Sequence, residues 1–283
     1  MVPPGSEPAL SRFLQSLGGI PAVKPSGTIP VPAGGRFTID GRQLRQVRQM
    51  EGHTQRLMEL SAFARADFFW TPARKRASEL SDRPAPARWV EAVRPLRDYF
   101  HEEVVGRISD PMLPVRARTK KIRDEERWTG YLVVLDVWPE VISWGYLLVP
   151  KGLDLSGGER RPVVVCQHGL GGGPASTIDP KSKAYNAYAA RLAERGFVVY
   201  SPYNPNAAAG GDRFRVLQRM ANPTKCSIFS VIMGQHQRIL EWLGGQPFVD
   251  KDRIGLYGLS YGGKTAMRVP ALLEGYALSI CSG

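Results

Sequence analysis

The sequence predicts an α/β protein: a mostly parallel sheet with an antiparallel meander at one edge, helices on both faces and additional N-terminal helices. Three observations support this. Two long helical patterns precede the first strand-like run. Strand-like runs between 115 and 149 are separated by short turns, which is typical of antiparallel pairing. From Pro162 onward, short apolar runs alternate with helical stretches, which favours parallel strands joined by right-handed crossovers.

The N-terminal third contains no strand pattern. Residues 1–40 are rich in Pro and Gly and have little periodicity, so we expect a flexible arm. Apolar residues recur at spacings of three and four over 43–70 and 87–105, which predicts two helices. We interpret 41–112 as a helical cap segment that covers the main domain or shapes a substrate entrance.

Residues 113–283 are predicted to form the core domain. The antiparallel meander is expected to use the runs 115–122, 131–138 and 141–149. The parallel part is expected to alternate strands and helices. Its strands are 162–167, 197–200, 254–257 and 277–281, and its helices are 184–195, 227–243 and a third that starts at Ser260.

The bulk composition excludes several classes. The 283 residues are 43% hydrophobic and 23% charged, as in folded globular proteins, and no apolar run is long enough to span a membrane. No leader pattern opens the chain, which favours a cytoplasmic location. Cys166, Cys226 and Cys281 are too scattered for a disulfide framework or a metal site. We therefore expect free thiols, buried at Cys166 and Cys281, and no cofactor.

The formal charge of +12 could indicate a nucleic-acid partner. However, the basic residues are spread along the chain and mixed with acidic ones. The densest cluster, 116–127, alternates with apolar residues, like the solvent side of a strand. Because no nucleic-acid-binding module is present, we expect a small-molecule partner and neither nucleic acid nor membrane. The sequence does not indicate an oligomeric state.

One motif carries chemistry. Gly258 to Gly262 reads G-x-S-x-G between an apolar strand and a helix. In this motif the serine, Ser260, occupies a sharp strained turn that presents its hydroxyl as a nucleophile, and crowding at the turn favours glycine two residues before and two residues after it, at Gly258 and Gly262. The N–H of Tyr261, at the start of the helix, is predicted to point at a developing oxyanion.

A second element fits the first. The run 163–166 leads into a glycine-rich loop, 167–173, which contains His168 and Gly169. Such a loop lets a further backbone N–H approach the same oxyanion, and we assign this donor to Leu170. Each such donor typically contributes about 10²-fold or more in rate.

These motifs resemble the α/β-hydrolase superfamily, and within it the dienelactone hydrolase and acetyl xylan esterase-like branch. The resemblance covers about 128–283. Its marks are His168-Gly169-Leu170, Asp250-x-Asp252-Arg253-Ile254-Gly255 and Gly258-x-Ser260-x-Gly262-Gly263. It implies hydrolysis of carboxylic esters or lactones through an acyl-enzyme at Ser260.

The family's chain order is serine, then acid, then histidine. After Ser260 this sequence has no histidine, and its only acid, Glu274, is expected at an exposed helix end. The four histidines all lie upstream and none is expected to be the general base: His53, His101, His168 and His236. We therefore expect a fragment or truncated gene product that lacks the C-terminal part of the fold and is weak or inactive.

Three alternatives remain. Gly258 to Thr265 also matches G-x-x-x-x-G-K-[ST], a P-loop in which Lys264 would hold phosphates and Thr265 a Mg²⁺ ion, with Asp136 ending a Walker B-like strand. Otherwise Lys264 faces solvent. The P-loop reading does not explain Gly262 or the His168-Gly169 loop. The other two alternatives are a prolyl-oligopeptidase-like peptidase and a non-catalytic binding protein with a hydrolase fold.

Substrate contacts are expected on the loop after the strand that ends at Tyr200. Within it, Asp212 and Arg213 could line the pocket or form a local ion pair. Tyr261 could pack beside the acyl group. The sequence does not identify the acyl or alcohol part of a substrate.

Overall fold

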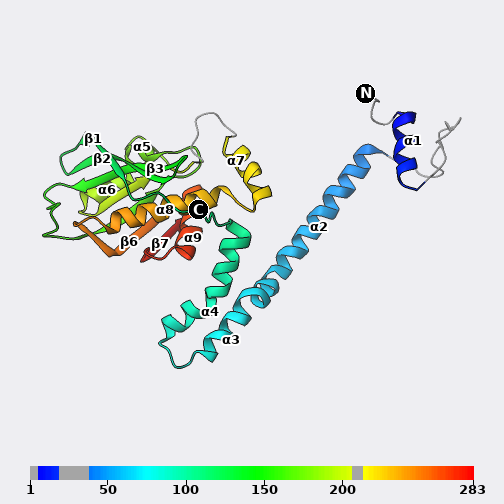
Figure 1. The fold of residues 1–283 in the computed structure, drawn as a ribbon, viewed down its shortest axis with the longest axis horizontal. Helices are drawn as coiled ribbons and strands as arrows, with labels where there is room; N and C mark the ends of the chain where they lie inside the picture. Colours follow the sequence, from blue (N-terminus) through cyan, green and yellow to red (C-terminus); the bar gives the residue numbers. More distant parts are fainter. Residues whose placement is uncertain (1–5, 19–37, 206–212) are drawn as a thin grey trace. The chain divides into compact units, whose positions relative to one another are not determined.

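The computed structural model describes residues 6–18, 38–205 and 213–283. The chain divides into two units, Met1–Phe68 and Phe69–Gly283, which are considered separately below. Figure 1 shows the helices of the first unit and the sheet and helices of the second. In the part of the chain described, no helix has the length and apolar character needed to cross a membrane.

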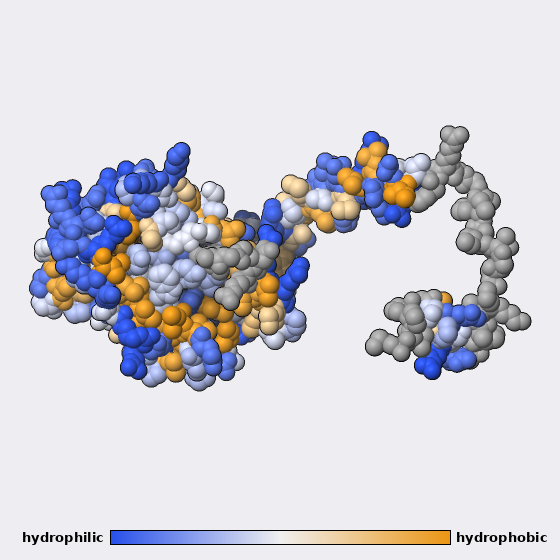
Figure 2. Space-filling view, turned by 90° about the horizontal axis from the view of Figure 1, so that it is seen from above, coloured by the Kyte–Doolittle hydropathy of each residue, from blue (hydrophilic) through white to orange (hydrophobic). Residues whose placement is uncertain are grey.

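The first unit contains helices α1 (Glu7–Ser16) and α2 (Ile39–Arg65). Thr38 caps α2 by accepting a hydrogen bond from the Gly41 N–H at 3.1 Å. The apolar side chains of α2 are exposed among charged ones, as Figure 2 shows. The sequence analysis did not predict α1, whose short amphipathic pattern stands among Pro and Gly residues. The flexibility of the N-terminal arm stays a prediction.

Three helical segments open the second unit after η1 (Ala66–Trp70), which spans the boundary: α3 (Thr71–Glu79), α4 (Ala85–Tyr99) and η2 (Phe100–Val105). Trp70 stacks on Trp89 of α4 with ring centroids 5.9 Å apart, which fastens the start of α3 to α4. The sequence analysis missed α3, because this helix carries too few apolar residues to show a periodic pattern.

Seven strands form one mixed sheet with the order β1-β2-β3-β5-β4-β6-β7. β1 to β3 form an antiparallel meander, and β3 is also antiparallel to β5. The strands β5, β4, β6 and β7 run parallel. The meander at one edge and the parallel block are confirmed. The strands are β1 (Ala117–Asp124), β2 (Trp128–Trp138), β3 (Val141–Pro150), β4 (Arg161–Gln167), β5 (Val198–Pro202), β6 (Val249–Leu259) and β7 (Leu278–Ser282).

Helices cover both faces of the sheet, as predicted. On one face, Val163 and Val165 of β4 share a buried cluster with residues of α8 and α9. On the other face, Cys166 of β4 packs with residues of α5 and α6. This alternation follows from the two-residue period of a strand. The helices are α5 (Pro174–Ile178), α6 (Tyr188–Glu194), α7 (Arg213–Ala221), η3 (Asn222–Thr224), α8 (Ile228–Gly244) and α9 (Tyr261–Leu272).

The expectation for the cysteines is half right. Cys166 is buried, and this burial raises the pKa of its thiol. Cys281, in contrast, is exposed. It lies on β7, which stands beside β6 at one edge of the sheet, and Leu278 and Ile280 of the same strand are exposed as well. An apolar strand pattern predicts burial only where another layer covers the strand.

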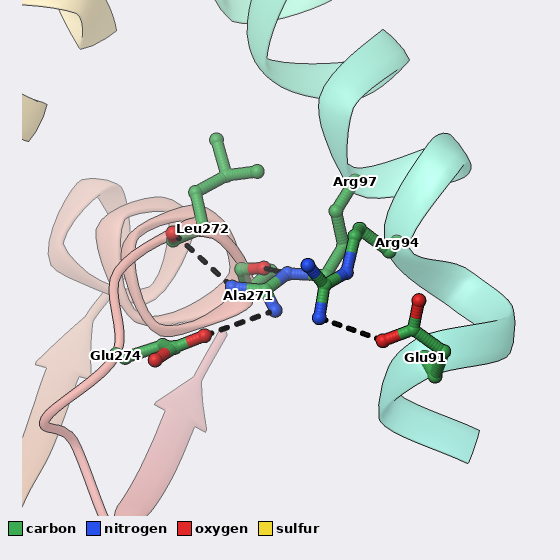
Figure 3. Close-up of polar contacts among 6 residues, drawn as sticks. All are labelled: Glu91, Arg94, Arg97, Ala271, Leu272 and Glu274. Atoms are coloured by element: carbon green, nitrogen blue, oxygen red, sulfur yellow. Dashed lines mark hydrogen bonds and ion pairs between the residues drawn. The ribbon is translucent and has the colours of Figure 1, made fainter. Parts of the chain in front are cut away.

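Arg97 of α4 fastens that helix to the C-terminal end of α9 (Figure 3). Its guanidinium donates to the carbonyl oxygens of Ala271 at 2.8 Å and Leu272 at 3.2 Å. It also pairs at 3.7 Å with Glu274, whose side chain is 88% exposed, as predicted for this carboxylate. This contact lies at the far end of α9 from Ser260, and the role of 41–112 as a cap segment stays a prediction.

Candidate active site

Ser260 stands at the turn between β6 and α9 with φ 56° and ψ −113°. Non-glycine residues rarely adopt a positive φ, which costs of order 1–3 kcal/mol and persists only where the surroundings impose it. Here the Ser260 N–H donates to the Ser282 carbonyl of β7 at 2.8 Å, which ties the turn to the neighbouring strand. The residue is exposed. The strained turn expected of the motif is present.

The glycines around Ser260 sit where no side chain fits. A Cβ at Gly258 would overlap the carbonyl group of Gly262, and a Cβ at Gly262 would overlap the carbonyl oxygen of Gln167 at the end of β4. A Cβ at Gly263 would lie 2.5 Å from the Ser282 oxygen. Close backbone packing of the turn against β4 and β7 therefore requires glycine at all three positions.

The glycine-rich loop lies directly over this turn. A Cβ at Gly169 would be 3.2 Å from the Cβ of Ser260. The buried imidazole of His168 holds the loop from below: its Nε2 accepts the Asn204 N–H at 3.0 Å, so its proton is on Nδ1, which donates to the Gly169 carbonyl at 2.8 Å. Burial lowers the pKa of His168. Both ring nitrogens are thus occupied in a neutral ring.

These bonds orient the predicted oxyanion donors. The Gly169 carbonyl points at His168, and in a trans peptide the N–H lies opposite the carbonyl, so the Leu170 N–H points away from the imidazole. Tyr261 is the first residue of α9, where a helix leaves its N–H without an intrahelical partner. Among the described residues, neither N–H has another hydrogen-bond partner. Both are available to an external acceptor, and their roles stay predictions.

A buried polar network lies beneath the turn. His236 of α8 contacts the Gln167 Oε1 at 3.2 Å through Nε2 and the Tyr276 hydroxyl at 2.8 Å through Nδ1. Burial lowers the pKa of His236 to about 3. In parallel, the Asn204 amide donates to the Thr265 hydroxyl at 3.2 Å. His236 is therefore occupied in a structural network, as is His168.

Neither Gln167 nor Tyr276 was predicted as a site residue, and Thr265 was predicted only as the Mg²⁺ ligand of the P-loop alternative. Gln167 and Asn204 lie at or just after the carboxyl ends of two neighbouring parallel strands, a position that could have drawn attention to them. For Tyr276 no sequence signal was available, because its contact with α8 depends on how the chain returns to β7.

Aromatic side chains stand beside the turn. The ring of Tyr261 stacks on Phe229 with centroids 5.8 Å apart, and Phe214 meets it edge-on at 6.2 Å. Partial burial raises the pKa of Tyr261. The predicted packing of Tyr261 beside an acyl group stays a prediction. Asp212 lies outside the described residues, and Arg213 begins α7, a helix where the sequence analysis expected only a loop.

The geometry does not form a P-loop. Three strands separate β2, which carries Asp136, from β6, and Arg118 binds Asp136 at 2.6 and 2.9 Å. Lys264 lies over the Tyr261 ring with its Nζ 5.1 Å from the centroid, while Thr265 is buried against Asn204. The tight packing of Gly258 against Gly262 leaves no space inside the turn for a phosphate group. The phosphate-binding alternative therefore has no support in the structure.

The other two histidines lie elsewhere. His53 is on α2 in the first unit. His101 is on η2, where burial and the nearby Arg107 lower its pKa, and it lines a cavity of about 700 Å³ with Trp138 and Arg238. Within the described residues, no group of three His, Cys, Asp or Glu side chains could hold a metal ion.

Comparisons with known proteins were made by sequence and by structure. No protein-family model matches the sequence, and no curated protein does. Among solved structures, a Bacteroides fragilis protein assigned as an acetyl xylan esterase has a TM-score of 0.55 and 17% identity, over 68% of this chain and 52% of its own. A glucuronoyl esterase from Solibacter usitatus has a TM-score of 0.51 and 16% identity, over 70% of this chain and 59% of its own.

This chain thus spans between about half and three fifths of the length of these two structures. At such low identity the likeness concerns the fold. It agrees with the strand order and with the helices on both faces of the sheet. The chain has the α/β-hydrolase fold, which it shares with acetyl xylan esterases and glucuronoyl esterases.

Proposed function

We propose that the chain is a serine hydrolase that acts on carboxylic esters or lactones through an acyl-enzyme at Ser260. The observation that carries this proposal is the positive φ of the exposed Ser260, imposed by glycines that no other residue could replace without a clash. Strain of this kind gathers at functional sites. The names of the two structural neighbours support an ester as the substrate, and more specifically an ester of a carbohydrate.

In the proposed mechanism the Ser260 oxygen attacks the acyl carbonyl carbon. The carbonyl π electrons move to the oxygen, which accepts hydrogen bonds from the N–H groups of Leu170 and Tyr261. Collapse of this tetrahedral intermediate expels the alcohol, which takes up the proton lost from the serine hydroxyl. Water then hydrolyses the acyl-enzyme by the same steps and releases the acid.

The serine proton needs an acceptor, and the two histidines nearest the turn do not supply one. The ring nitrogens of His168 and His236 all make hydrogen bonds inside the protein. We therefore propose that the 283-residue polypeptide acylates slowly. Without the base, substrate binding and the oxyanion contacts still accelerate hydrolysis by about 10³–10⁴-fold over the reaction in water.

Reaction with a fluorophosphonate and with a nitrophenyl ester tests the proposal. The fluorophosphonate should add one phosphonyl group to the peptide that contains Ser260, and Ser260→Ala should abolish this addition. Lys264→Ala is the matched control, because it should leave labelling intact if the turn is not a phosphate site. Because acylation is expected to be slow, a wild-type protein that stays unlabelled even after prolonged incubation would overturn the assignment of Ser260. Rapid multiple turnover of the nitrophenyl ester would contradict the slow acylation.

A further inference from the structure

Tyr185 contacts the glycine-rich loop through its phenol oxygen. Its phenol oxygen accepts a hydrogen bond from the Gly169 N–H at 2.7 Å. A Cβ at Gly172 would lie 2.6 Å from the same oxygen. The loop therefore packs around the phenol oxygen, and the absence of a side chain at Gly172 leaves the space that this oxygen occupies.

The backbone next to Tyr185 is strained. Asn186 and Ala187 follow it with φ of 50° and 52°, the left-handed region that L-residues avoid at a cost of roughly 1–2 kcal/mol each. The Asn186 N–H donates to the Ser182 carbonyl at 2.7 Å, and its side-chain oxygen accepts from Arg191 at 2.9 Å. Ala187 is buried and has no polar side chain to compensate. The two strained residues directly follow Tyr185, so they belong to the segment that places its phenol ring against the loop.

The two peptide groups that flank Gly169 are each held by a side chain. Tyr185 binds the N–H of the first peptide, between His168 and Gly169. His168 binds the carbonyl of the second, between Gly169 and Leu170. Because peptide groups are planar, holding both limits rotation about the two soft dihedral angles of Gly169, a residue without a side chain to restrict them. The direction of the Leu170 N–H then depends on both contacts.

We propose that Tyr185 is a positioning residue of the oxyanion loop: its hydroxyl anchors the Gly169 N–H and so keeps the Leu170 N–H aimed at the oxygen that forms at Ser260. This role rests on the proposed function, because that oxygen exists only if Ser260 attacks an acyl or phosphonyl group. Tyr185 acts through Gly169 and does not touch the reacting atoms.

The direct test is Tyr185→Phe, which removes the hydroxyl and keeps the ring. Saturation kinetics of fluorophosphonate labelling separate reversible binding (KI) from bond formation (kinact). Loss of a well-placed oxyanion donor typically costs about 10²–10³-fold, so a donor that is misaimed but present should lower kinact by roughly tenfold. KI should stay within about twofold, because reversible binding of the probe precedes the developing charge.

Tyr146→Phe is the matched control. Tyr146 lies on β3, and its hydroxyl makes no hydrogen bond among the described residues, so its removal should change neither constant. A Tyr185→Phe protein with wild-type kinact would overturn the positioning role. A parallel change of kinact, KI and melting temperature would overturn it too, because general loosening of the fold would then explain the loss.

Gly172→Ala provides a second variant that does not depend on the first. Its methyl group should collide with the Tyr185 hydroxyl, displace the loop and lower kinact in the wild-type background. In the Tyr185→Phe background the colliding oxygen is gone, so the further loss should be clearly smaller. Additive losses would contradict the proposed contact. If wild-type Ser260 is not labelled at all, the proposed function fails and this role with it, whereas normal labelling of Tyr185→Phe refutes only the role.

Discussion

The Nε2 atom of His236, in the middle of α8, lies 3.2 Å from the side-chain oxygen of Gln167, the last residue of β4. The other ring nitrogen meets the Tyr276 hydroxyl at 2.8 Å. This buried imidazole thus joins the helix to the strand that supports the glycine-rich loop. Burial disfavours the charged imidazole and lowers the pKa of His236 to about 3, so the ring is neutral in the folded protein.

Stability is expected to fall as the pH drops below about 6.5. The unfolded chain takes up a proton at His236 near the ordinary pKa of 6.5, whereas the folded protein resists protonation down to about pH 3. Within this window the free energy of unfolding should lose about 1.4 kcal/mol per pH unit for this one group. Urea unfolding at about pH 5 and pH 6, where carboxylates remain ionised, measures the slope.

His236→Gln is the comparison. Glutamine does not titrate, so the free energy of unfolding of the variant should depend less steeply on pH, by the contribution of one histidine. Burial also lowers the pKa of His168, and the contribution of His168 to the slope is the same in both proteins. Equal slopes in the wild type and the variant would mean that His236 is not the group that titrates.

Ser260→Gly is expected to be more stable than Ser260→Ala. Both variants lack the nucleophile, but only glycine adopts φ 56° and ψ −113° without steric cost. Glycine relieves the backbone strain, but it also loses more conformational entropy on folding than alanine does. Together these two effects predict that the glycine variant has a free energy of unfolding about 1 kcal/mol higher. Parallel denaturant titrations measure it, and a more stable alanine variant would refute the strain.

Gly258→Ala should destabilise the protein severely. The added methyl group would overlap the backbone of Gly262, so the turn must shift, and we expect a loss of about 3 kcal/mol or more in unfolding free energy. Gly255→Ala on the same strand is the control, since its Cβ would meet atoms no closer than 3.7 Å. A melting temperature equal to that of Gly255→Ala would contradict the tight turn.

Arg97 should contribute more to stability than its neighbour Arg94, although Figure 3 shows an ion pair for each. Arg97 binds two terminal carbonyls of α9 and is 27% exposed, so Arg97→Ala should cost about 1–2 kcal/mol. Arg94 pairs with Glu91 alone among the described residues and is 62% exposed, so Arg94→Ala should cost less than about 0.5 kcal/mol. Thermal unfolding of both variants tests this order, and equal losses would contradict it.

Local patterns in the sequence were sufficient to predict most strands and helices of the core domain. Alternation identified β2 and β3, and apolar runs bounded by helices identified β4 to β7, because each signal arises within a few residues. The elements that were missed had weak local signals: α3 has few apolar residues, and α7 follows a stretch dominated by Gly, Ala and Asn. The burial wrongly expected at Cys281 depends on a neighbouring layer, which a local pattern does not reveal.

Some residues of the candidate site could likewise be predicted from local sequence, and others could not. Ser260 and its glycines were predictable because a sharp turn needs specific residues at fixed spacing. The two contacts that hold the peptide groups of Gly169 were only half predictable: His168 is its neighbour in sequence, but Tyr185 lies 16 residues further along the same β4–β5 connection and meets the loop only through the tertiary fold. No sequence spacing encodes such a contact.

A crystal structure of the fluorophosphonate adduct shows directly whether the Leu170 and Tyr261 N–H groups point at the oxyanion. We expect phosphorus bonded to the Ser260 oxygen and the phosphonyl oxygen about 2.7–3.1 Å from both the Leu170 and Tyr261 nitrogens. A phosphonyl oxygen turned toward solvent, with both N–H groups unoccupied, would contradict this oxyanion site.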